Sequence, residues 1–233
     1  MKLDILHTLN AERAARRAVV VVTQIENGEQ RIVKASDVAR DPLRDVIEKR
    51  LRMAKSGMEE TAEGRVFLTV HVPSARLVVT GAVHISQALA PMAALVGYDV
   101  TIVDPRTAFA SPERFPDVKL IAEWPDAALP PLNIDHYTAF VALTHDPKID
   151  DPTLLHALQR ECFYIGALGS RKTHGRRVER LKQAGISDAA IARIHAPIGL
   201  AIGAVSPAEI AVSILAEITQ SLRVKNETAA VAT

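Results

Sequence analysis

The sequence predicts an α/β protein in which a small N-terminal α+β domain, residues 1–73, precedes a doubly wound parallel sheet in residues 74–233. From residue 76 onward, short apolar segments alternate with segments of helical period, which is typical of βαβ units. Before residue 76, two strand-like segments flank a turn, and a helical segment separates them from a further strand. With 48% hydrophobic residues among 233, the chain can bury a full core.

The N-terminal domain is expected to contain a hairpin, one helix and a third strand. The turn signal of the hairpin is Asn27-Gly28, and the start signal of the helix is Asp41 followed by Pro42. The expected elements are hairpin strands at 17–25 and 30–34, a helix from Pro42 that stops at Ser56-Gly57, and a strand at 65–72.

The second domain is expected to alternate five strands with four helices. The final helix has the clearest start signal, with Ser206 as cap, Pro207 in the first turn, and Glu209 completing a capping box. The last eleven residues are expected to fray. The expected strands are 77–81, 100–104, 118–122, 137–144 and 163–167, and the other helices are 86–96, 152–161 and 171–184.

Charge and cysteine content disfavour several classes of protein. The chain has 28 Lys and Arg against 27 Asp and Glu, a net charge of +1, so it lacks the bulk charge on which many nucleic-acid binders rely. Cys162 is the only cysteine, which excludes an intramolecular disulfide and a multi-thiolate zinc site. Without a signal-peptide pattern or a membrane-length apolar run, we expect a cytoplasmic protein with no membrane partner.

The loop after the first strand of the second domain has a dinucleotide-binding layout with an altered fingerprint. Gly81 follows that strand and Asp104 closes the next one, so a helix start would face a pyrophosphate and an acid would face a ribose in a Rossmann-like fold. The G-x-G-x-x-G pattern needs glycines where Val83 and Ser86 stand. The Val83 side chain disfavours NAD(P) binding, and Val83→Gly is expected to restore some. The alternative is a tight βα turn that serves only the scaffold.

A second glycine-containing loop, after the expected strand 163–167, has the features of an anion cradle. Gly166, Gly169 and the capping hydroxyl of Ser170 lead into a helix that begins with Arg171. Free backbone amides and the helix dipole at such a start favour a phosphate. Six basic residues against one acid fill the helix 171–184, and the alternative reading is a solvated basic face.

No residue pattern identifies a catalytic group or a metal centre. His145 and Asp146 end the fourth expected strand of the sheet, at the edge where open α/β sheets bind ligands. Asp150 and Asp151 follow, but two prolines favour an acidic turn over a metal cluster. The nucleophile elbow and the Tyr-x-x-x-Lys pair of short-chain dehydrogenases are missing from the sequence, and His84 and His195 are expected to be hydrogen-bonding histidines.

Several segments resemble one known family. Tyr164-Ile-Gly-Ala-Leu-Gly-Ser-Arg171 and His195-Ala-Pro-Ile-Gly-Leu-Ala-Ile-Gly-Ala204 are the most specific of them, and the others are 81–91, 103–106, 144–146 and 206–211. In collinear order over about residues 74–222, they resemble the XdhC/CoxI family of xanthine dehydrogenase accessory proteins. The family's Gly-Ser-x-Pro-Arg and Gly-Gly-Cys-Val-Glu stretches do not occur in residues 1–73, and Val83 replaces the second glycine of its first loop.

The resemblance implies a maturation factor for a molybdenum hydroxylase of the xanthine or carbon monoxide dehydrogenase type. Such a chaperone binds the molybdenum cofactor, as molybdopterin or its dinucleotide form, and assists its sulfuration and insertion. The implied partners are the apoenzyme, a cysteine desulfurase or a separate N-terminal-domain protein, and a second copy in a homodimer. The alternatives are an NAD(P)-dependent oxidoreductase and a partner subunit without ligand. The residues assigned to cofactor binding are Gly81, His84, Asp104, Arg106, His145, Asp146, Gly166, Gly169, Ser170 and Arg171.

Overall fold

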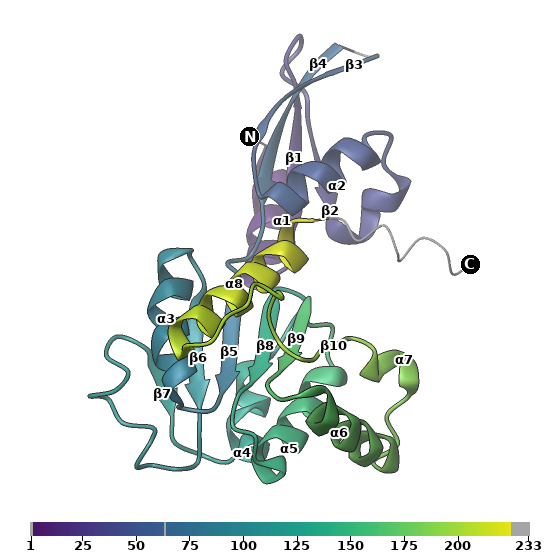
Figure 1. Ribbon diagram of the computed structural model, residues 1–233. Coiled ribbons are helices and arrows are strands. Elements are labelled where there is room, and N and C mark those ends of the chain that lie inside the picture. The colour runs from purple at the N-terminus through teal and green to yellow at the C-terminus, as the bar shows by residue number, and fades with distance from the viewer. Residues whose placement is uncertain (1, 63, 225–233) are drawn as a thin grey trace. The chain divides into compact units, whose positions relative to one another are not determined.

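The computed structural model describes residues 2–62 and 64–224, and the chain divides into two compact units, Met1–Pro73 and Ser74–Thr233 (Figure 1). The predicted fraying of the last eleven residues falls mostly on 225–233, which lie outside the described residues. Among the described residues, no helix is both long and apolar enough to cross a membrane.

The first unit is a four-stranded antiparallel sheet in the order β2-β1-β4-β3, with helices beside it. Its core is built on the β-branched run of β1, because Val20 and Val22 pack with Ile47 and Leu68. The elements are α1 (Leu3–Ala14), β1 (Val19–Gln24), β2 (Gln30–Lys34), η1 (Ala35–Arg40), α2 (Arg44–Met53), β3 (Gly57–Thr61) and β4 (Gly64–His71).

The hairpin and the third strand of this unit are confirmed as β1, β2 and β4, but three elements were missed and one boundary differs. Asp41 does receive a hydrogen bond from the amide of Leu43, at 2.9 Å, yet regular α-helix begins only at Arg44, after a turn at residues 41–43 in which the Arg44 amide donates to the Asp41 carbonyl oxygen at 3.0 Å. The missed elements are α1, the 3₁₀ helix η1 and the glutamate-containing strand β3, whose local patterns are weak.

The second unit is a six-stranded parallel sheet in the order β10-β9-β8-β5-β6-β7, which confirms the predicted Rossmann-like class. The chain enters at β5, builds outward through β6 and β7, and returns to the other side of β5 with β8. The elements are β5 (Arg76–Thr80), α3 (His84–Leu95), β6 (Asp99–Val103), β7 (Lys119–Ile121), α4 (Pro125–Ala128), η2 (Pro130–Leu132), β8 (Thr138–Ala142), α5 (Pro147–Leu158), β9 (Tyr164–Ala167), α6 (Arg171–Gln183), α7 (Asp188–Ile191), β10 (Ile194–His195) and α8 (Pro207–Arg223).

Helices cover both faces of this sheet. Figure 1 shows α3 and α8 on one face, where Leu89 and Ile214 pack on Val79, and α5 and α6 on the other, where Leu154 and Leu181 are buried. The predicted capping box of α8 is confirmed, since the Ser206 hydroxyl accepts from the Glu209 amide at 3.2 Å and the Glu209 carboxylate accepts from the Ser206 amide at 2.8 Å.

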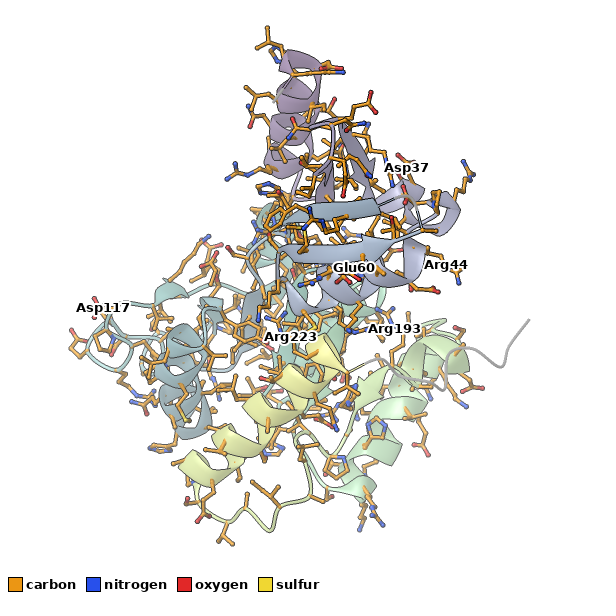
Figure 2. The ribbon with its side chains drawn as sticks, turned by 90° about the horizontal axis from the view of Figure 1, so that it is seen from above. Asp37, Arg44, Glu60, Asp117, Arg193 and Arg223 are labelled. Atoms are coloured by element: carbon orange, nitrogen blue, oxygen red, sulfur yellow. The ribbon has the colours of Figure 1, made fainter. Side chains whose placement is uncertain are left out.

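Arg193, labelled in Figure 2, closes the end of α5. Its guanidinium donates to the carbonyl oxygen of Leu158, the last residue of the helix, at 3.1 Å, and to those of Arg160 and Cys162 in the segment that follows at 2.9 and 3.3 Å. The Cys162 thiol is buried, and burial raises its pKa to about 11. Cys162 is therefore a packing residue, as predicted, and carries little thiolate at neutral pH.

Candidate functional site

The strand order reverses between β5 and β8, and the loops at their carboxyl ends meet there. Gly81 has φ +114°, and a Cβ at this position would lie 3.0 Å from Thr144 Cγ2 and 3.3 Å from the Leu143 carbonyl carbon. The β5 loop therefore packs directly on the β8 loop, and both the positive φ and these close contacts favour glycine at position 81. Open α/β sheets bind ligands at this switch point, so the candidate site lies at this edge.

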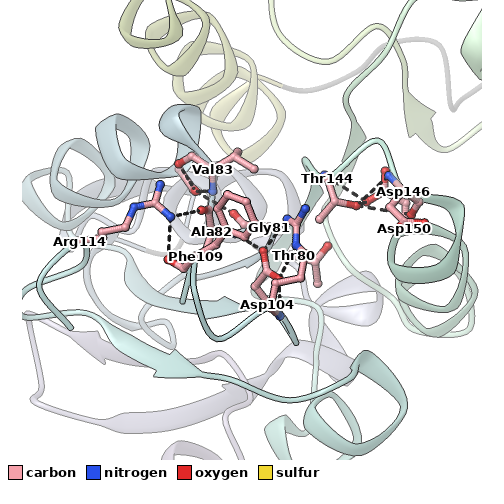
Figure 3. Close-up of polar contacts among 12 residues, drawn as sticks. Thr80, Gly81, Ala82, Val83, Asp104, Phe109, Arg114, Thr144, Asp146 and Asp150 are labelled. Carbon is pink, nitrogen blue, oxygen red and sulfur yellow. Dashed lines mark hydrogen bonds and ion pairs between the residues drawn. The ribbon is translucent and has the colours of Figure 1, made fainter. Parts of the chain in front are cut away.

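Asp104 anchors the β5 loop from below. Its carboxylate is fully buried and accepts from the Ala82 amide at 2.7 Å, from the Arg106 amide and Nε at 2.9 Å, and from Arg106 Nη2 at 2.7 Å (Figure 3). Burial alone raises the pKa of Asp104, but the hydrogen bonds from Arg106 and Ala82 outweigh it and hold the pKa below its ordinary value. Both oxygens are occupied, so the structure does not leave Asp104 open for a ribose as the sequence suggested.

Arg106 is likewise committed to the scaffold. Its guanidinium bonds Asp104 and lies 4.6 Å from the centre of the Phe109 ring, with its side chain about one-third exposed. Arg114 reinforces the same corner by donating to the carbonyl oxygens of Ala82 at 2.9 Å and Phe109 at 2.7 Å. The two arginines fix the loop and leave one exposed edge of Arg106 toward solvent.

The amides of the β5 loop are already bonded within the protein. Besides Ala82, the Val83 amide donates to Ser86 Oγ at 2.8 Å, and that hydroxyl lies 2.7 Å from the Gly81 carbonyl oxygen. Val83 itself is half-buried against the core, and His84 is exposed as the first residue of α3. The Val83 side chain was expected to hinder pyrophosphate binding at this loop. The hydrogen bonds add a second obstacle, because the amides of residues 82 and 83 are not free to donate to a ligand.

The β8 loop is shaped by Asp150 and Asp146. Thr144 donates to Asp150 Oδ1 through its hydroxyl at 2.5 Å and its amide at 3.2 Å, while Asp146 caps α5 by accepting from the Lys148 amide at 2.9 Å. Between them His145 is exposed and has φ +61°, a conformation that costs a non-glycine residue about 1 kcal/mol. The loop thus presents the His145 ring at the edge of the sheet.

Gly166, within β9, and Gly169, in the loop that follows this strand (the β9 loop), serve different purposes. A Cβ on Gly166 would lie 2.5 Å from Ile198 Cδ1 and 2.8 Å from Tyr164 Cε1, so the lack of a side chain at this position makes room for packing. Gly169 has φ +133°, and its Cβ would lie 3.8 Å from His145 Nδ1. Ser170 caps α6 as predicted, accepting from the Thr173 amide at 3.2 Å. The structure brings His145 and Gly169 together across the two loops.

The basic residues of α6 divide into two groups along the helix. In the later turns Arg177 lies 3.6 Å from Asp150, Lys182 lies 2.6 Å from Asp188, and Arg180 pairs with Asp151. Three others are exposed and have no acidic partner within residues 2–62 and 64–224, namely Arg171, Lys172 and Arg176. The uncompensated positive charge is therefore concentrated in the first two turns, where the helix dipole is also positive.

Arg177 holds the β9 loop in place through a hydrogen bond to its backbone. Its side chain is 2% exposed, and Nη2 donates to the Leu168 carbonyl oxygen at 2.9 Å while facing Asp150. Burial lowers the pKa of Arg177 and raises that of Asp150. The buried side-chain atoms without a hydrogen bond, among the described residues, are Arg177 Nε and Nη1, Asp150 Oδ2 and His174 Nδ1. This buried pair joins the β9 loop to the β8 loop.

No group of three or more His, Cys, Asp or Glu side chains within the described part of the chain is placed to hold a metal ion. The acids that follow His145 have other partners, since Asp146 caps α5, Asp150 bonds Thr144, and Asp151 pairs with Arg180.

One polar network escaped the sequence reasoning. Glu217 on α8 accepts hydrogen bonds from Tyr164 Oη at 2.6 Å and the Gly199 amide at 2.8 Å, and it lies 3.0 Å from His195 Nδ1. A signal was available, because Glu217 stands seven residues after Ile210, on the apolar stripe of the final helix.

Comparison with known proteins agrees with this architecture. The family model of the XdhC Rossmann domain matches residues 77–218. The chain belongs to the XdhC family. A xanthine dehydrogenase structure from Bacillus halodurans is similar with a TM-score of 0.66 and 25% identity, covering 99% of this chain and 68% of that one.

Curated relatives are similar over most of this chain. An uncharacterized protein of Escherichia coli K12, YqeB, is 36% identical over 75% of the chain, and the molybdenum cofactor insertion chaperone PaoD of the same organism is 34% identical over 66%. A Bacillus subtilis protein named as a probable xanthine dehydrogenase component is 33% identical over 64%. The alignments cover 33%, 42% and 43% of these relatives, so the chain spans less than half of each.

Proposed function

We propose that this XdhC-family protein is a maturation factor for a molybdenum hydroxylase of the xanthine or carbon monoxide dehydrogenase type. It binds the molybdenum cofactor as cargo and assists its sulfuration and insertion. The similarity to a relative named as a molybdenum cofactor insertion chaperone supports the role, and so do two relatives named as xanthine dehydrogenases.

The observation that carries the proposal is the start of α6. Three exposed cations without acidic partners lie in its first two turns, beside the amides of Gly169 and Ser170, which have no partner among the described residues. Molybdopterin and its dinucleotide forms carry phosphate groups, and cations with aligned amides at a helix start bind phosphate. Of the residues assigned from sequence, Gly169, Ser170, Arg171 and His145 are therefore the ones we propose to contact cargo.

We assign the remaining six residues no direct contact with the cargo. Five of them hold the loops in place, and the sixth, His84, lies beside the β5 loop. Asp104 and Arg106 bond each other, Asp146 caps α5, and Gly81 and Gly166 make room for packing. His84 is exposed at the start of α3, where the neighbouring loop amides are already bonded.

Removing one cation from each end of α6 tests the proposal. Arg171→Ala is expected to weaken binding of molybdopterin and of pyrophosphate by about 1.5–3 kcal/mol, the range for hydrogen bonds to charged groups. Lys182→Ala, on the same helix, removes the same charge far from its start and is expected to leave affinity unchanged. Isothermal titration of both variants decides, and equal affinities for wild type and Arg171→Ala would refute the assignment.

The proposed partners are the molybdenum hydroxylase apoenzyme, a cysteine desulfurase or a separate N-terminal-domain protein, and a second copy of this chain. A carrier must hand over its cargo, so co-purification at low salt from a cofactor-producing host is expected to recover the hydroxylase. The NAD(P)-dependent oxidoreductase remains the second candidate. Recovery of no such partner, together with turnover of a nicotinamide substrate, would favour it.

A further inference from the structure

The carboxylate of Glu217, on α8, contacts three residues that lie outside the loop proposed to bind phosphate. Glu217 Oε2 accepts from Tyr164 Oη at 2.6 Å and from the Gly199 amide at 2.8 Å, and Oε1 lies 3.0 Å from His195 Nδ1. The Tyr164 and His195 rings also stack, with centroids 4.6 Å apart and planes inclined by 32°. The imidazole is thus held both in its plane and at one nitrogen.

These contacts determine which nitrogen of His195 carries the proton. Burial raises the pKa of Glu217, but the hydrogen bonds from His195, Tyr164 and Gly199 outweigh it, and the carboxyl stays ionised at neutral pH. An ionised carboxylate only accepts, so Nδ1 of His195 must donate. In the neutral ring Nε2 then has a lone pair and no proton, which makes it a hydrogen-bond acceptor.

This acceptor lies at the same edge of the sheet as the proposed cargo site. His195 ends β10, and its Cα pairs with that of Gly166, three residues before Gly169. The side chain of His195 is 37% exposed, whereas Tyr164 is buried. Gly166 is what admits the Tyr164 ring and Ile198, since a side chain at 166 would overlap both. The imidazole is therefore held by Glu217 and Tyr164 while part of its side chain is open to solvent.

We propose that His195 Nε2 accepts a hydrogen bond from an N–H group of the pterin ring of the cargo, with Glu217 and Tyr164 as positioning residues. The inference rests on the proposed function. Phosphate oxygens accept hydrogen bonds and are negative, so a lone-pair acceptor does not suit them. A pterin ring carries amino and ring N–H donors. The site then has two chemically different ends, with cations and amides at α6 and an acceptor at β10.

The tautomer is tested first. In protein labelled with ¹⁵N-histidine, the His195 signals are assigned by their loss in His195→Phe. In the neutral imidazole, Nδ1 is expected to show the chemical shift of a protonated nitrogen and Nε2 that of an unprotonated one. The reverse pattern would overturn the inference.

Two small probes separate the two ends of the site. 6-Hydroxymethylpterin has the ring and no phosphate, and inorganic pyrophosphate has no ring. His195→Phe keeps an aromatic ring against Tyr164 and removes the acceptor, so it is expected to weaken pterin binding about tenfold and leave pyrophosphate affinity unchanged. Arg171→Ala is expected to do the opposite. His136→Phe, at an exposed histidine before β8, is the matched control and should change neither affinity.

Glu217→Gln is expected to weaken pterin binding as well, because a glutamine amide can donate to Nδ1 and invert the tautomer. Melting curves accompany the titrations, and if this variant is unfolded, His195→Phe still decides. Unchanged pterin affinity in folded His195→Phe overturns the inference alone. Failure of the wild type to bind either probe refutes the proposed function, and the inference with it.

Discussion

Two loops at one edge of the parallel sheet are each supported by a buried charge, and the charges are opposite. Beneath the β5 loop, Asp104 is fully buried and accepts from the Ala82 amide. Beneath the β9 loop, Arg177 is 2% exposed and donates to the Leu168 carbonyl oxygen. Each buried charge therefore takes one kind of backbone group from its loop, an amide from the first and a carbonyl oxygen from the second.

A buried carboxylate accepts a hydrogen bond from a loop amide, whereas a buried guanidinium donates one to a loop carbonyl oxygen. In the β5 loop the Ala82 amide is bonded to Asp104, and the Val83 amide is bonded to the Ser86 hydroxyl. In the β9 loop the amides of Gly169 and Ser170 have no partner within the described residues, and positive charge lies beside them. Anions are therefore expected at the β9 loop, although the β5 loop has the more familiar dinucleotide-binding layout.

The largest expected effect comes from removing the buried base. Arg177→Met leaves Asp150 buried without a counter-charge and the Leu168 carbonyl unpaired, so we expect a loss of about 3–5 kcal/mol in the free energy of unfolding at pH 7. Arg176→Met, at the exposed neighbouring position, is expected to change it by less than about 0.5 kcal/mol. Urea unfolding measures both, and similar losses for the two variants would contradict the supporting role of Arg177.

The same variant has a signed dependence on pH. Burial already raises the pKa of Asp150, and loss of Arg177 raises it further. An acid with a raised folded-state pKa stabilises the fold below its unfolded pKa of about 3.9, and this contribution is lost as pH rises through the folded value. The deficit of Arg177→Met relative to wild type should therefore shrink between about pH 7 and pH 4. A constant deficit would mean that Asp150 is not the penalised group.

Removing the buried acid is expected to have a smaller effect. In Asp104→Asn the side-chain amide replaces the carboxylate that pairs with Arg106. Because that guanidinium is one-third exposed and water can solvate it, we expect a loss of about 2–3 kcal/mol in the free energy of unfolding. Asp99→Asn, at the exposed start of β6, the strand that Asp104 follows, is the control. If Asp104 were instead a ribose ligand, unfolding would be unchanged and only a nucleotide affinity would fall.

The pH dependence of this second support has the opposite sign. The pKa of Asp104 is held below its ordinary value, so its stabilisation is complete above about pH 4 and is lost as pH falls through the folded-state pKa. Acid unfolding of Asp104→Asn should therefore lack the part of the transition that the wild type shows below about pH 4. Identical acid transitions would exclude Asp104 as their source.

Sequence reasoning located both loops because local signals mark them. Apolar runs predicted the strands of the parallel sheet, and β8 is buried along its whole length as such runs require. The two-residue strand β10 was too short to detect, and the strand order depends on pairings between distant segments, which periodicity does not contain. The fold class was therefore predictable, while the switch point between β5 and β8 was not.

The chemistry of the site depended on contacts that spacing cannot supply. Asp104 was expected to face a ribose, but Arg106, two residues later, occupies its oxygens. Gly166 was expected to belong to a phosphate-binding loop, and the structure adds that its missing side chain makes room for the Tyr164 ring and Ile198. Residue type identified these positions as special, and only the three-dimensional neighbours explain why.

The next largest effect is a difference in stability between alanine variants of two glycines that both have a positive φ. Gly81 at +114° and Gly97 at +95° both impose backbone strain on alanine, but a Cβ meets Thr144 and Leu143 at position 81 and nothing within 4 Å at position 97. Gly81→Ala should therefore cost about 1–2 kcal/mol more than Gly97→Ala. Thermal melting compares them, and equal costs would show that the β5 and β8 loops can move apart freely.

The smallest expected effect is on nucleotide binding at the β5 loop. The sequence alone suggests that Val83→Gly restores NAD binding, but the hydrogen bonds change that expectation, because the amides of residues 82 and 83 stay bonded to Asp104 and Ser86. We expect no measurable binding of NAD or NADP at millimolar ligand in wild type or Val83→Gly. The double variant Val83→Gly/Ser86→Ala frees the amide at position 83 and is expected to show weak binding. Melting curves check the backbone-entropy cost of the glycine, about 1 kcal/mol. Micromolar NAD binding by the wild type would mean that the internal bonds yield easily, and the contrast between the two loops would fail.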